Sequence, residues 1–429
     1  MPLTRRQFVV GSSLAAAYAA TGTARIGGLV YGQTAGTNEI LVVLYLRGGI
    51  DGLNFAAPVN EPNYVASRST LRLRESGTDA GLPLANPIGN GVDFRLHPSA
   101  RPLLDLYQAG ALAIVHAVGL TVANRSHFDA QSLMEGGVPT ARQQTGWLTR
   151  HITSSGGQGG VLPTVAASSS LPGALIGSGS AIAMPNLANF ALPGDPTIFP
   201  AMTRMYTGTT PLHMAGFNAI HAIQSVNSAI GRPPTGGTLP AYTPENGATY
   251  AQPETQTGSL GAALITIARL IKLDVGLRVA TLDVGGWDTH NNQGLTTGTY
   301  ANNVDSLARN LLAFYNDMVR YRQRVTLVAM SEFGRTLREN QSGGTDHGRA
   351  SIMLVLGGSV NGGRMFGRWP GLSSNALDGG DLAVTTDYRQ VLAEILVRRL
   401  RNTQLSTVFP GLGAYQPLGI VQGNDLPTT

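Results

Sequence analysis

Short apolar runs without a charged side chain recur along this sequence. Two of them, ILVVLYL at 40–46 and VTLVAM at 325–330, are rich in β-branched residues and are shorter than typical helices. Strands of parallel sheets have this character because helices cover both of their faces. Further strands are predicted at 111–118, 276–284 and 351–358, and amphipathic helices at 260–273 and 300–321 alternate with them. The pattern predicts an α/β domain with a mostly parallel central sheet and helices on both faces.

One histidine, His116, lies inside the apolar run at 111–118. A histidine in such a strand is more often a buried, hydrogen-bonded side chain than a metal ligand. We therefore expect His116 to have a structural role.

A segment of different composition interrupts the alternation at about residues 152–257. Between Ile152 and Leu260 the charged residues are Asp195, Arg204, Arg232, Glu245 and Glu254, while small residues, threonine and proline dominate. We predict an insertion of short strands and long loops with one helix at 211–231, followed by a linker-like tail. Residues 37–429 are expected to form a single domain that carries this low-charge insertion.

The N-terminus has the pattern of a twin-arginine export signal. Arg5 and Arg6 are followed by Phe8 and then by a short, weakly apolar stretch. This stretch is too short and too rich in glycine and serine to predict a stable membrane anchor. We expect residues 1–36 to be a signal peptide and leader, the twin-arginine export machinery to be a partner, and the mature protein to be periplasmic or extracellular.

The composition excludes some partners and ligands. The formal net charge is +5, but Lys272 is the only lysine and there is no basic run with interleaved aromatic residues, so we expect no nucleic-acid partner. The sequence contains no cysteine, which excludes disulfides and thiolate ligands. Any metal site must therefore be built from oxygen and nitrogen ligands.

Acidic residues and histidines follow three of the predicted strands. The glycine turn after 40–46 carries Asp51, the loop after 276–284 carries Asp288 and His290, and the segment after 325–330 carries Glu332, Asp346 and His347. Each has an ordinary explanation, such as a turn aspartate that bonds its own backbone. Because the carboxyl ends of parallel strands share one edge of a sheet, we expect these side chains to meet there.

Clustered carboxylates repel one another unless positive charge compensates them. Divalent cations give this compensation, and mixed oxygen and nitrogen ligands suit zinc, manganese or magnesium, with calcium as a further option. We expect two such ions, because two ions roughly 4 Å apart bind both the attacking and the leaving oxygen of an in-line displacement. A metal-free network of charges is the alternative.

The segment NRSHFDAQ at 124–131 begins a predicted helix. Ser126, with Asp129 three residues later, resembles a capping box, which makes Ser126 an N-cap. A hydroxyl at this position also suits nucleophilic attack on a bound anion, because the helix N-terminus stabilises negative charge. The residues leave these two interpretations about even, and the neighbouring Arg125 and His127 favour the functional one.

Five motifs follow one another in order: RGGIDG, NRSHFDAQ, GGWDTHNNQ, SEFGRT and TDHGRASIMLVLGG. Behind a twin-arginine leader, they resemble a bacterial family catalogued as domain of unknown function 1501, over nearly all of the mature chain. That family is similar to the alkaline phosphatase and sulfatase superfamily, whose sheet carries a two-metal site and a serine, threonine or formylglycine nucleophile. The resemblance implies an alkaline-phosphatase-like fold.

The resemblance also implies roles for single residues. Asp51 matches the metal aspartate after the first strand, and Ser126 matches the nucleophile. Asp288 and His290 match the paired ligands of one metal.

For the remaining ligands the match leaves two possibilities. Either His347 is a lone histidine ligand with Glu332 replacing the usual aspartate, which we favour, or Asp346 and His347 are themselves the pair. The chain departs from the superfamily in the short interval between Asp288 and His290. It also has Ser-Glu where an Asp-His pair usually follows the later strand.

These observations together predict an exported metal-dependent hydrolase of phosphate esters, acting on a small-molecule or polymer substrate. Sulfate esters are less favoured, because no formylglycine motif surrounds Ser126. Ser126 would attack beside His127, and Arg335 or Arg125 would hold a non-bridging oxygen. The alternatives are a secreted, non-catalytic binding or assembly protein that retains the fold, and a metal-independent hydrolase that uses Ser126 and a histidine.

Overall fold

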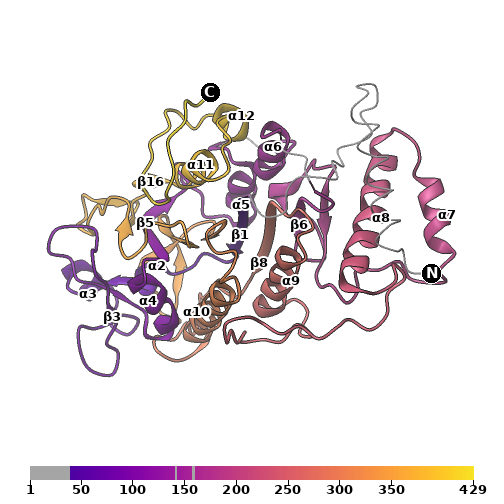
Figure 1. The fold of residues 1–429 in the computed structure, drawn as a ribbon. Coiled ribbons are helices and arrows are strands. Elements are labelled where there is room, and N and C mark those ends of the chain that lie inside the picture. The colour runs from indigo at the N-terminus through magenta and orange to yellow at the C-terminus, as the bar shows by residue number, and fades with distance from the viewer. Residues whose placement is uncertain (1–38, 141–142, 157–159) are drawn as a thin grey trace.

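The computed structural model describes residues 39–140, 143–156 and 160–429. The predicted signal peptide and leader at 1–36 lie outside these residues, so export stays a prediction. Within the described residues the main sheet has nine strands in the order β13-β5-β12-β9-β1-β8-β6-β7, and β16 pairs with β5 (Figure 1).

The strands of this sheet are β1 (Ile40–Leu46), β5 (Leu112–Gly119), β6 (Thr164–Ala166), β7 (Ala181–Ala183), β8 (Val279–Val284), β9 (Val325–Met330), β12 (Ser351–Gly357), β13 (Met365–Phe366) and β16 (Thr386–Asp387). Three small sheets are formed by β2 (Ala56–Pro58), β3 (Leu82–Pro83) and β4 (Phe94–Leu96), by β10 (Arg335–Glu339) and β11 (Thr345–His347), and by β14 (Leu377–Asp378) and β15 (Asp381–Leu382).

The α-helices are α2 (Gly52–Phe55), α3 (Pro62–Ser67), α4 (Arg101–Gln108), α5 (His127–Gly136), α6 (Trp147–Ser154), α7 (Ile198–Met205), α8 (Pro211–Ile230), α9 (Leu260–Lys272), α10 (Thr299–Asp317), α11 (Tyr388–Arg398) and α12 (Leu405–Val408). Two 3-10 helices, η1 (Pro98–Ala100) and η2 (Gly173–Leu175), complete the regular structure of the described residues. None of these helices combines the length and apolar character needed to cross a bilayer.

The absence of charge from β1 follows from burial on both sides of the sheet. Val42 and Leu44 pack into one apolar layer with α4, α9 and α10, whereas Leu41 and Val43 pack into the other with α5, α6 and α11. Figure 1 shows these two groups of helices on opposite faces of the sheet. Either face would leave a charged side chain without water, which is why both faces of the strand are apolar.

Five neighbouring strands, β9, β1, β8, β6 and β7, run parallel to one another. β12 runs antiparallel between β9 and β5. The predicted α/β class, with a mostly parallel central sheet and helices on both faces, is confirmed. Near their carboxyl ends β1, β8 and β9 are in register, since Tyr45 pairs with Asp283 on one side and Met330 on the other. The loops that leave these three strands therefore start side by side.

The low-charge segment lengthens the sheet. β6 pairs with β8, and β7 pairs with β6, so that the segment adds two short parallel strands to one side. α7 and α8 lie beyond them, at the right of Figure 1. α8 corresponds to the helix predicted at 211–231, whereas α7 has no counterpart among the sequence predictions.

The tail of this segment has no helix or strand, yet it is tied to the domain. The buried carboxylate of Asp317 accepts hydrogen bonds from the Tyr242 hydroxyl at 2.5 Å, the Tyr250 hydroxyl at 2.9 Å and the Glu245 backbone N–H at 2.6 Å. The ammonium group of Lys272 contacts the same carboxylate at 2.5 Å. Three donors from the tail and one from α9 thus converge on Asp317 of α10 and hold the tail against both helices.

His116 is buried within β5 and is hydrogen-bonded on both sides of its ring. Nε2 lies 3.2 Å from the Ala56 carbonyl oxygen, and Nδ1 accepts from the Ala117 N–H at 2.9 Å. The structural role predicted for this histidine is confirmed. Burial lowers its pKa from 6.5 to about 4, because the charged imidazolium cannot be hydrated there.

We expect this histidine to make the fold acid-sensitive between pH 6.5 and pH 4. Below pH 6.5 His116 takes up a proton in the unfolded chain but stays neutral in the folded one. The free energy of unfolding is therefore highest above pH 6.5 and decreases as the pH falls toward 4. Denaturant unfolding at pH 7.5 and 4.5 should show a loss about 2 kcal/mol larger in the wild type than in His116→Gln, which cannot titrate. Equal losses in the two proteins would contradict this assignment.

Candidate metal centre

A buried arginine joins the loops that follow the central strands. The Nε of Arg335 donates to the Gly49 carbonyl oxygen at 2.7 Å, and Nη1 donates to the Thr345 carbonyl oxygen at 2.9 Å. Nη2 contacts the carbonyl oxygens of Gly48 and Trp287, and Asp288 Oδ1 at 2.6 Å. One guanidinium thus connects the loop after β1, the loop after β8 and the start of β11.

The same packing explains a glycine in the first of these loops. Gly48 has φ of +123°, and a Cβ atom built on it would lie 2.4 Å from the backbone nitrogen of Asp288. No other residue could bring the loop after β1 this close to the loop after β8.

Three histidine rings converge on one carboxylate oxygen at this edge. Asp288 Oδ1 lies 3.1 Å from His290 Nε2, 3.1 Å from His347 Nε2 and 3.4 Å from His127 Nε2. The Nε2 atoms of His290 and His347 are only 2.9 Å apart. His127 begins α5, Asp288 and His290 follow β8, and His347 ends β11. We call these four residues the His₃Asp cluster.

Each ring has a hydrogen-bond acceptor at its other nitrogen. Nδ1 of His127 lies 2.8 Å from Glu332 Oε1, and Nδ1 of His290 lies 2.7 Å from Asp346 Oδ1. Nδ1 of His347 lies 2.8 Å from the backbone carbonyl oxygen of Arg125. Carboxylate and carbonyl oxygens can accept a hydrogen bond but cannot donate one. The proton of each neutral ring therefore belongs on Nδ1, and Nε2 is left with a lone pair.

The interior of the cluster is therefore rich in lone pairs and poor in protons. His127 Nε2 is buried and makes no hydrogen bond within the described part of the chain. His290 and His347 each carry their proton on Nδ1 in this arrangement. Their Nε2 atoms, 2.9 Å apart, therefore have no hydrogen atom between them and repel each other. Positive charge placed between these atoms would remove the repulsion.

The donor set fits a divalent cation. Three imidazole nitrogens and one carboxylate oxygen suit zinc or manganese, and backing of each ring by an acceptor is the usual arrangement around metal-bound histidine. Tetrahedral bonds of about 2.0–2.1 Å place neighbouring ligand atoms about 3.3 Å apart. Four of the six separations within the cluster lie at 2.9–3.4 Å, close to this value. The ligand atoms of His127, Asp288 and His347 all lie within 4.8 Å of one another, whereas His290 joins the group through Asp288 and His347.

Charge and solvent access are also suitable. Burial opposes ionisation of Asp288, but the hydrogen bond and the positive charge of Arg335 outweigh it and lower the pKa of Asp288 to about 2. The carboxylate is therefore ionised at neutral pH. Its side chain is 47% exposed, so a ligand in solvent can reach the cluster.

Two of the predicted metal ligands lie one hydrogen bond outside the cluster. Glu332 is fully buried, and its carboxylate accepts from the Gly48 N–H at 2.9 Å, Gln131 Nε2 at 2.9 Å and the Ser331 hydroxyl at 3.0 Å, besides His127. Asp346 is exposed and accepts from Asn340 Nδ2 at 3.1 Å as well as from His290.

Asp51 is not brought into the cluster. Its two oxygens form a fully buried, bidentate ion pair with Arg68 at 2.7 and 2.9 Å, and Gln293 Nε2 donates to it at 2.8 Å. Both carboxylate oxygens of Asp51, in the loop after β1, are thus engaged, and Asp51 is not in the group of mutually close ligand atoms.

Ser126 lies next to the cluster and caps α5. Its hydroxyl accepts from the Asp129 N–H at 3.4 Å, and the side chain is exposed. The guanidinium of the preceding Arg125 pairs with Asp381. The donors of Arg335 are engaged by the loops, as described above. Of the predicted catalytic residues, His127 therefore belongs to the cluster, Ser126 and Arg125 flank it, and Arg335 supports it.

Three features of this site were not evident in the sequence. His127 contributes a ring nitrogen to the cluster, Arg68 neutralises Asp51, and Gln131 links Glu332 to Arg47. The one available signal was the position of His127 beside Ser126 at a helix start. Its hydrogen-bond partner lies 205 residues away, and no local pattern reports such a distance.

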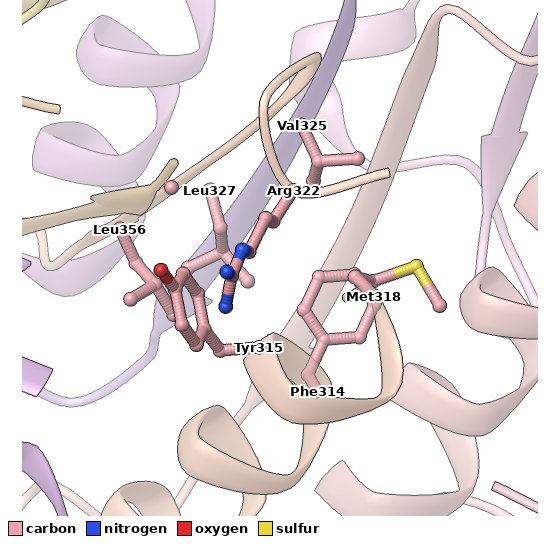
Figure 2. Close-up of a pocket in the computed structure, with 8 residues that line it drawn as sticks. Phe314, Tyr315, Met318, Arg322, Val325, Leu327 and Leu356 are labelled. Atoms are coloured by element: carbon pink, nitrogen blue, oxygen red, sulfur yellow. The ribbon is translucent and has the colours of Figure 1, made fainter. Parts of the chain in front are cut away.

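Two hollows lie at the opposite edge of the sheet, where β9 begins. Figure 2 shows the smaller one, of about 10 Å³, lined by Phe314, Tyr315, Met318, Arg322, Val325, Leu327, Leu356 and Gly357. The larger, of about 510 Å³, is lined by Glu39, Arg320, Tyr321, Gln323, Arg324, Ser359 and Arg399. The first has room for about one water molecule. Neither contains a residue of the His₃Asp cluster.

Comparison with solved structures finds remote likenesses. The crystal structure of Ps i-CgsB has 10% identity and a TM-score of 0.35, covering 88% of this chain and 76% of that one. The lipoteichoic acid synthase LtaP from Listeria monocytogenes has 9% identity and a TM-score of 0.29, covering 92% and 79%. The alkaline phosphatase from the Antarctic bacterium TAB5 has 11% identity and a TM-score of 0.28, covering 75% and 92%. Likenesses this remote say nothing about the activity of this chain.

Comparison with curated proteins finds no match. A family model does match, over residues 219–404, and its description is protein of unknown function, DUF1501. This range contains three members of the cluster, Asp288, His290 and His347, together with Glu332 and Asp346. The family whose model matches residues 219–404 is the one that the motifs of the sequence resemble.

Proposed function

We propose that this protein is a metal-dependent hydrolase of phosphate esters, with sulfate esters as the less favoured substrates. The observation that carries the proposal is the inward direction of three imidazole lone pairs and one carboxylate oxygen in the His₃Asp cluster. A divalent cation held there would supply Lewis-acid stabilisation of negative charge on a phosphoryl oxygen. Zinc and manganese suit the nitrogen-rich donor set better than magnesium or calcium.

The proposal places one ion in the cluster. A second ion was expected from the sequence, with Asp51 and Glu332 among its ligands. Asp51 is neutralised by Arg68, and Glu332 accepts hydrogen bonds on both oxygens. Among the described residues, three members of the cluster, His127, Asp288 and His347, offer ligand atoms that all lie within 4.8 Å of one another.

Ser126 is the proposed nucleophile. It directly precedes His127, and consecutive Cα atoms lie about 3.8 Å apart, so its backbone is next to that of a cluster member. The N-terminus of α5 favours negative charge at this position. The hydroxyl attacks phosphorus, the ester oxygen leaves and takes a proton, and water then releases phosphate and restores the serine. Secretion, predicted from residues 1–36, belongs to the same proposal.

We expect the purified protein to bind about one equivalent of zinc or manganese. Asp288→Asn and His347→Ala should each weaken binding 10- to 100-fold or more, because each removes a ligand atom. His221→Ala is the matched control, since this histidine lies on α8, far along the chain from the cluster, and should leave the affinity unchanged. Elemental analysis and calorimetric titration measure both quantities. Unchanged affinity in the two cluster variants would contradict the proposed site.

We expect the metal-loaded protein to hydrolyse aryl phosphates faster than diesters or aryl sulfates. Ser126→Ala should reduce kcat at least 100-fold by removing the attacking oxygen. Alanine also removes an N-cap worth about 1 kcal/mol, so Ser126→Asn is the sharper variant, because asparagine caps a helix as well as serine does. It should keep the stability and metal content of the wild type and lose the activity.

Three outcomes would change the assignment. Activity of Ser126→Asn within twofold of the wild type would mean that Ser126 is only a cap. Activity that survives complete chelation would exclude the metal. A metal-loaded protein that hydrolyses none of these esters would instead support the non-catalytic binding protein.

A further inference from the structure

The larger of the two hollows at the opposite edge of the sheet has a charged lining. Its volume of about 510 Å³ falls within the range of small-molecule sites, about 300–1,000 Å³. Among the described residues that line it, three are arginines, Arg320, Arg324 and Arg399, and one is acidic, Glu39. Three positive charges thus face one negative charge in this hollow.

The ends of several elements build the hollow. Glu39 directly precedes β1, Arg324 directly precedes β9, and Arg399 directly follows α11. The Gln323 carbonyl oxygen accepts from the Ser359 hydroxyl at 2.7 Å and from Arg399 Nη2 at 2.9 Å. Residues from distant parts of the chain therefore meet here and are joined by hydrogen bonds.

Two of the arginines contact the same aromatic ring. The guanidinium carbon atoms of Arg320 and Arg324 lie 5.7 and 5.2 Å from the centroid of the Tyr321 ring, which also lines the hollow. Contacts of this kind stabilise a cation beside an aromatic side chain. Arg324 also pairs with Asp274 across 3.8 Å. The shared ring keeps two positively charged groups close to each other in the hollow.

Nearby carboxylates engage the other two arginines in part. Glu245 contacts Nε and Nη2 of Arg320 at 2.9 and 2.5 Å and leaves Nη1, and the Arg320 side chain is 67% exposed. Glu39 Oε1 accepts from Arg399 Nη2 at 2.6 Å. Glu39 Oε2 and Arg399 Nε are buried and make no hydrogen bond within the described part of the chain. The protein's own groups therefore leave the hydrogen bonding around this hollow incomplete.

The chemistry of the lining indicates the kind of occupant. The residues that precede Glu39 carry Arg5, Arg6 and Arg25 and no acidic side chain, so their charge does not complement that of the hollow. A guanidinium matches the paired oxygens of a carboxylate or a phosphate group. A volume in the range of small-molecule sites has room for an organic group as well.

We propose that this hollow binds a small organic oxyanion, a carboxylate or a phosphate compound, at a site separate from the His₃Asp cluster. Arg320 and Arg324 donate to the anionic group, and Arg399 adds positive charge. Glu39 limits the affinity because it is the negative charge of the lining. None of these residues belongs to the proposed metal site, so anion binding here is independent of the proposed function.

Binding of inorganic phosphate and of succinate to the full-length, metal-free protein tests this site. Chelation removes any ion from the His₃Asp cluster, so that phosphate has no metal to bind there. In about 0.15 M salt, long-range attraction to surface arginines is largely screened. By calorimetry we expect saturable binding of at least one of the two anions, and the tighter one identifies the group that the hollow recognises.

Three variants test the residues. Arg320→Gln should raise the Kd about 5-fold or more, because it removes a charged donor. Arg309→Gln is the matched control, since Arg309 pairs with Asp305 on α10, is 51% exposed and does not line the hollow. It loses the same charge and should change the Kd less than twofold. Glu39→Gln keeps an acceptor for Arg399 but removes the negative charge, so the Kd should fall.

Different results would overturn the proposed anion site. Binding of neither anion by the metal-free wild type would do so, as would equal effects of Arg320→Gln and Arg309→Gln. A higher Kd in Glu39→Gln would show that the hollow does not select negative charge. All of these measurements use protein without metal, so a failure of the proposed hydrolase activity leaves them unaffected.

Discussion

The organisation of this site depends on the buried guanidinium of Arg335. Three parallel strands deliver their loops to one edge, but parallel strands alone do not determine how those loops lie. Arg335 donates hydrogen bonds to backbone carbonyl oxygens of two strand-end loops and of Thr345. It also donates to the carboxylate of Asp288. A planar group with five donors in a fixed fork is suited to this task, and a lysine could not replace it. Because the loops are fixed in this way, Asp288 and the histidines can approach one another closely.

A second level of order determines which atoms face inward. The acceptors Glu332, Asp346 and the Arg125 carbonyl oxygen each hold the outer nitrogen of one ring. This choice of tautomer makes the inner nitrogens electron donors and raises the cost of leaving the centre without positive charge. Residues that looked like ligands in the sequence therefore contribute through the histidines that they orient. Glu332 illustrates this, since it is fully buried and engaged by four separate donors.

Sequence reasoning succeeded where local pattern and topology determine the answer. The apolar runs predicted the strands, and the rule that parallel strands share an edge predicted that Asp288, His290 and His347 would meet. It did not reach features that depend on a partner outside the local motif. Asp51 was expected to bind metal because it follows the carboxyl end of the first strand, but both of its oxygens pair with Arg68, seventeen residues on. Arg335 was expected to bind substrate, and the close backbone packing that occupies it leaves no sequence signal. The antiparallel direction of β12 was likewise not evident, because an apolar strand reads the same in either direction.

That antiparallel strand affects how the site is assembled. β9, the β10–β11 hairpin and β12 form one continuous stretch that leaves the sheet and returns to it, so His347 is delivered by contacts between near neighbours in the chain. His127 comes from another region and approaches this stretch only through the start of α5. An ion bound by both His347 and His127 would connect the stretch from β9 to β12 with α5, a helix from a distant part of the chain. Losing that ion would loosen α5 at its first turn and leave the sheet beneath it intact, so a shortage of metal would disable the site without unfolding the domain.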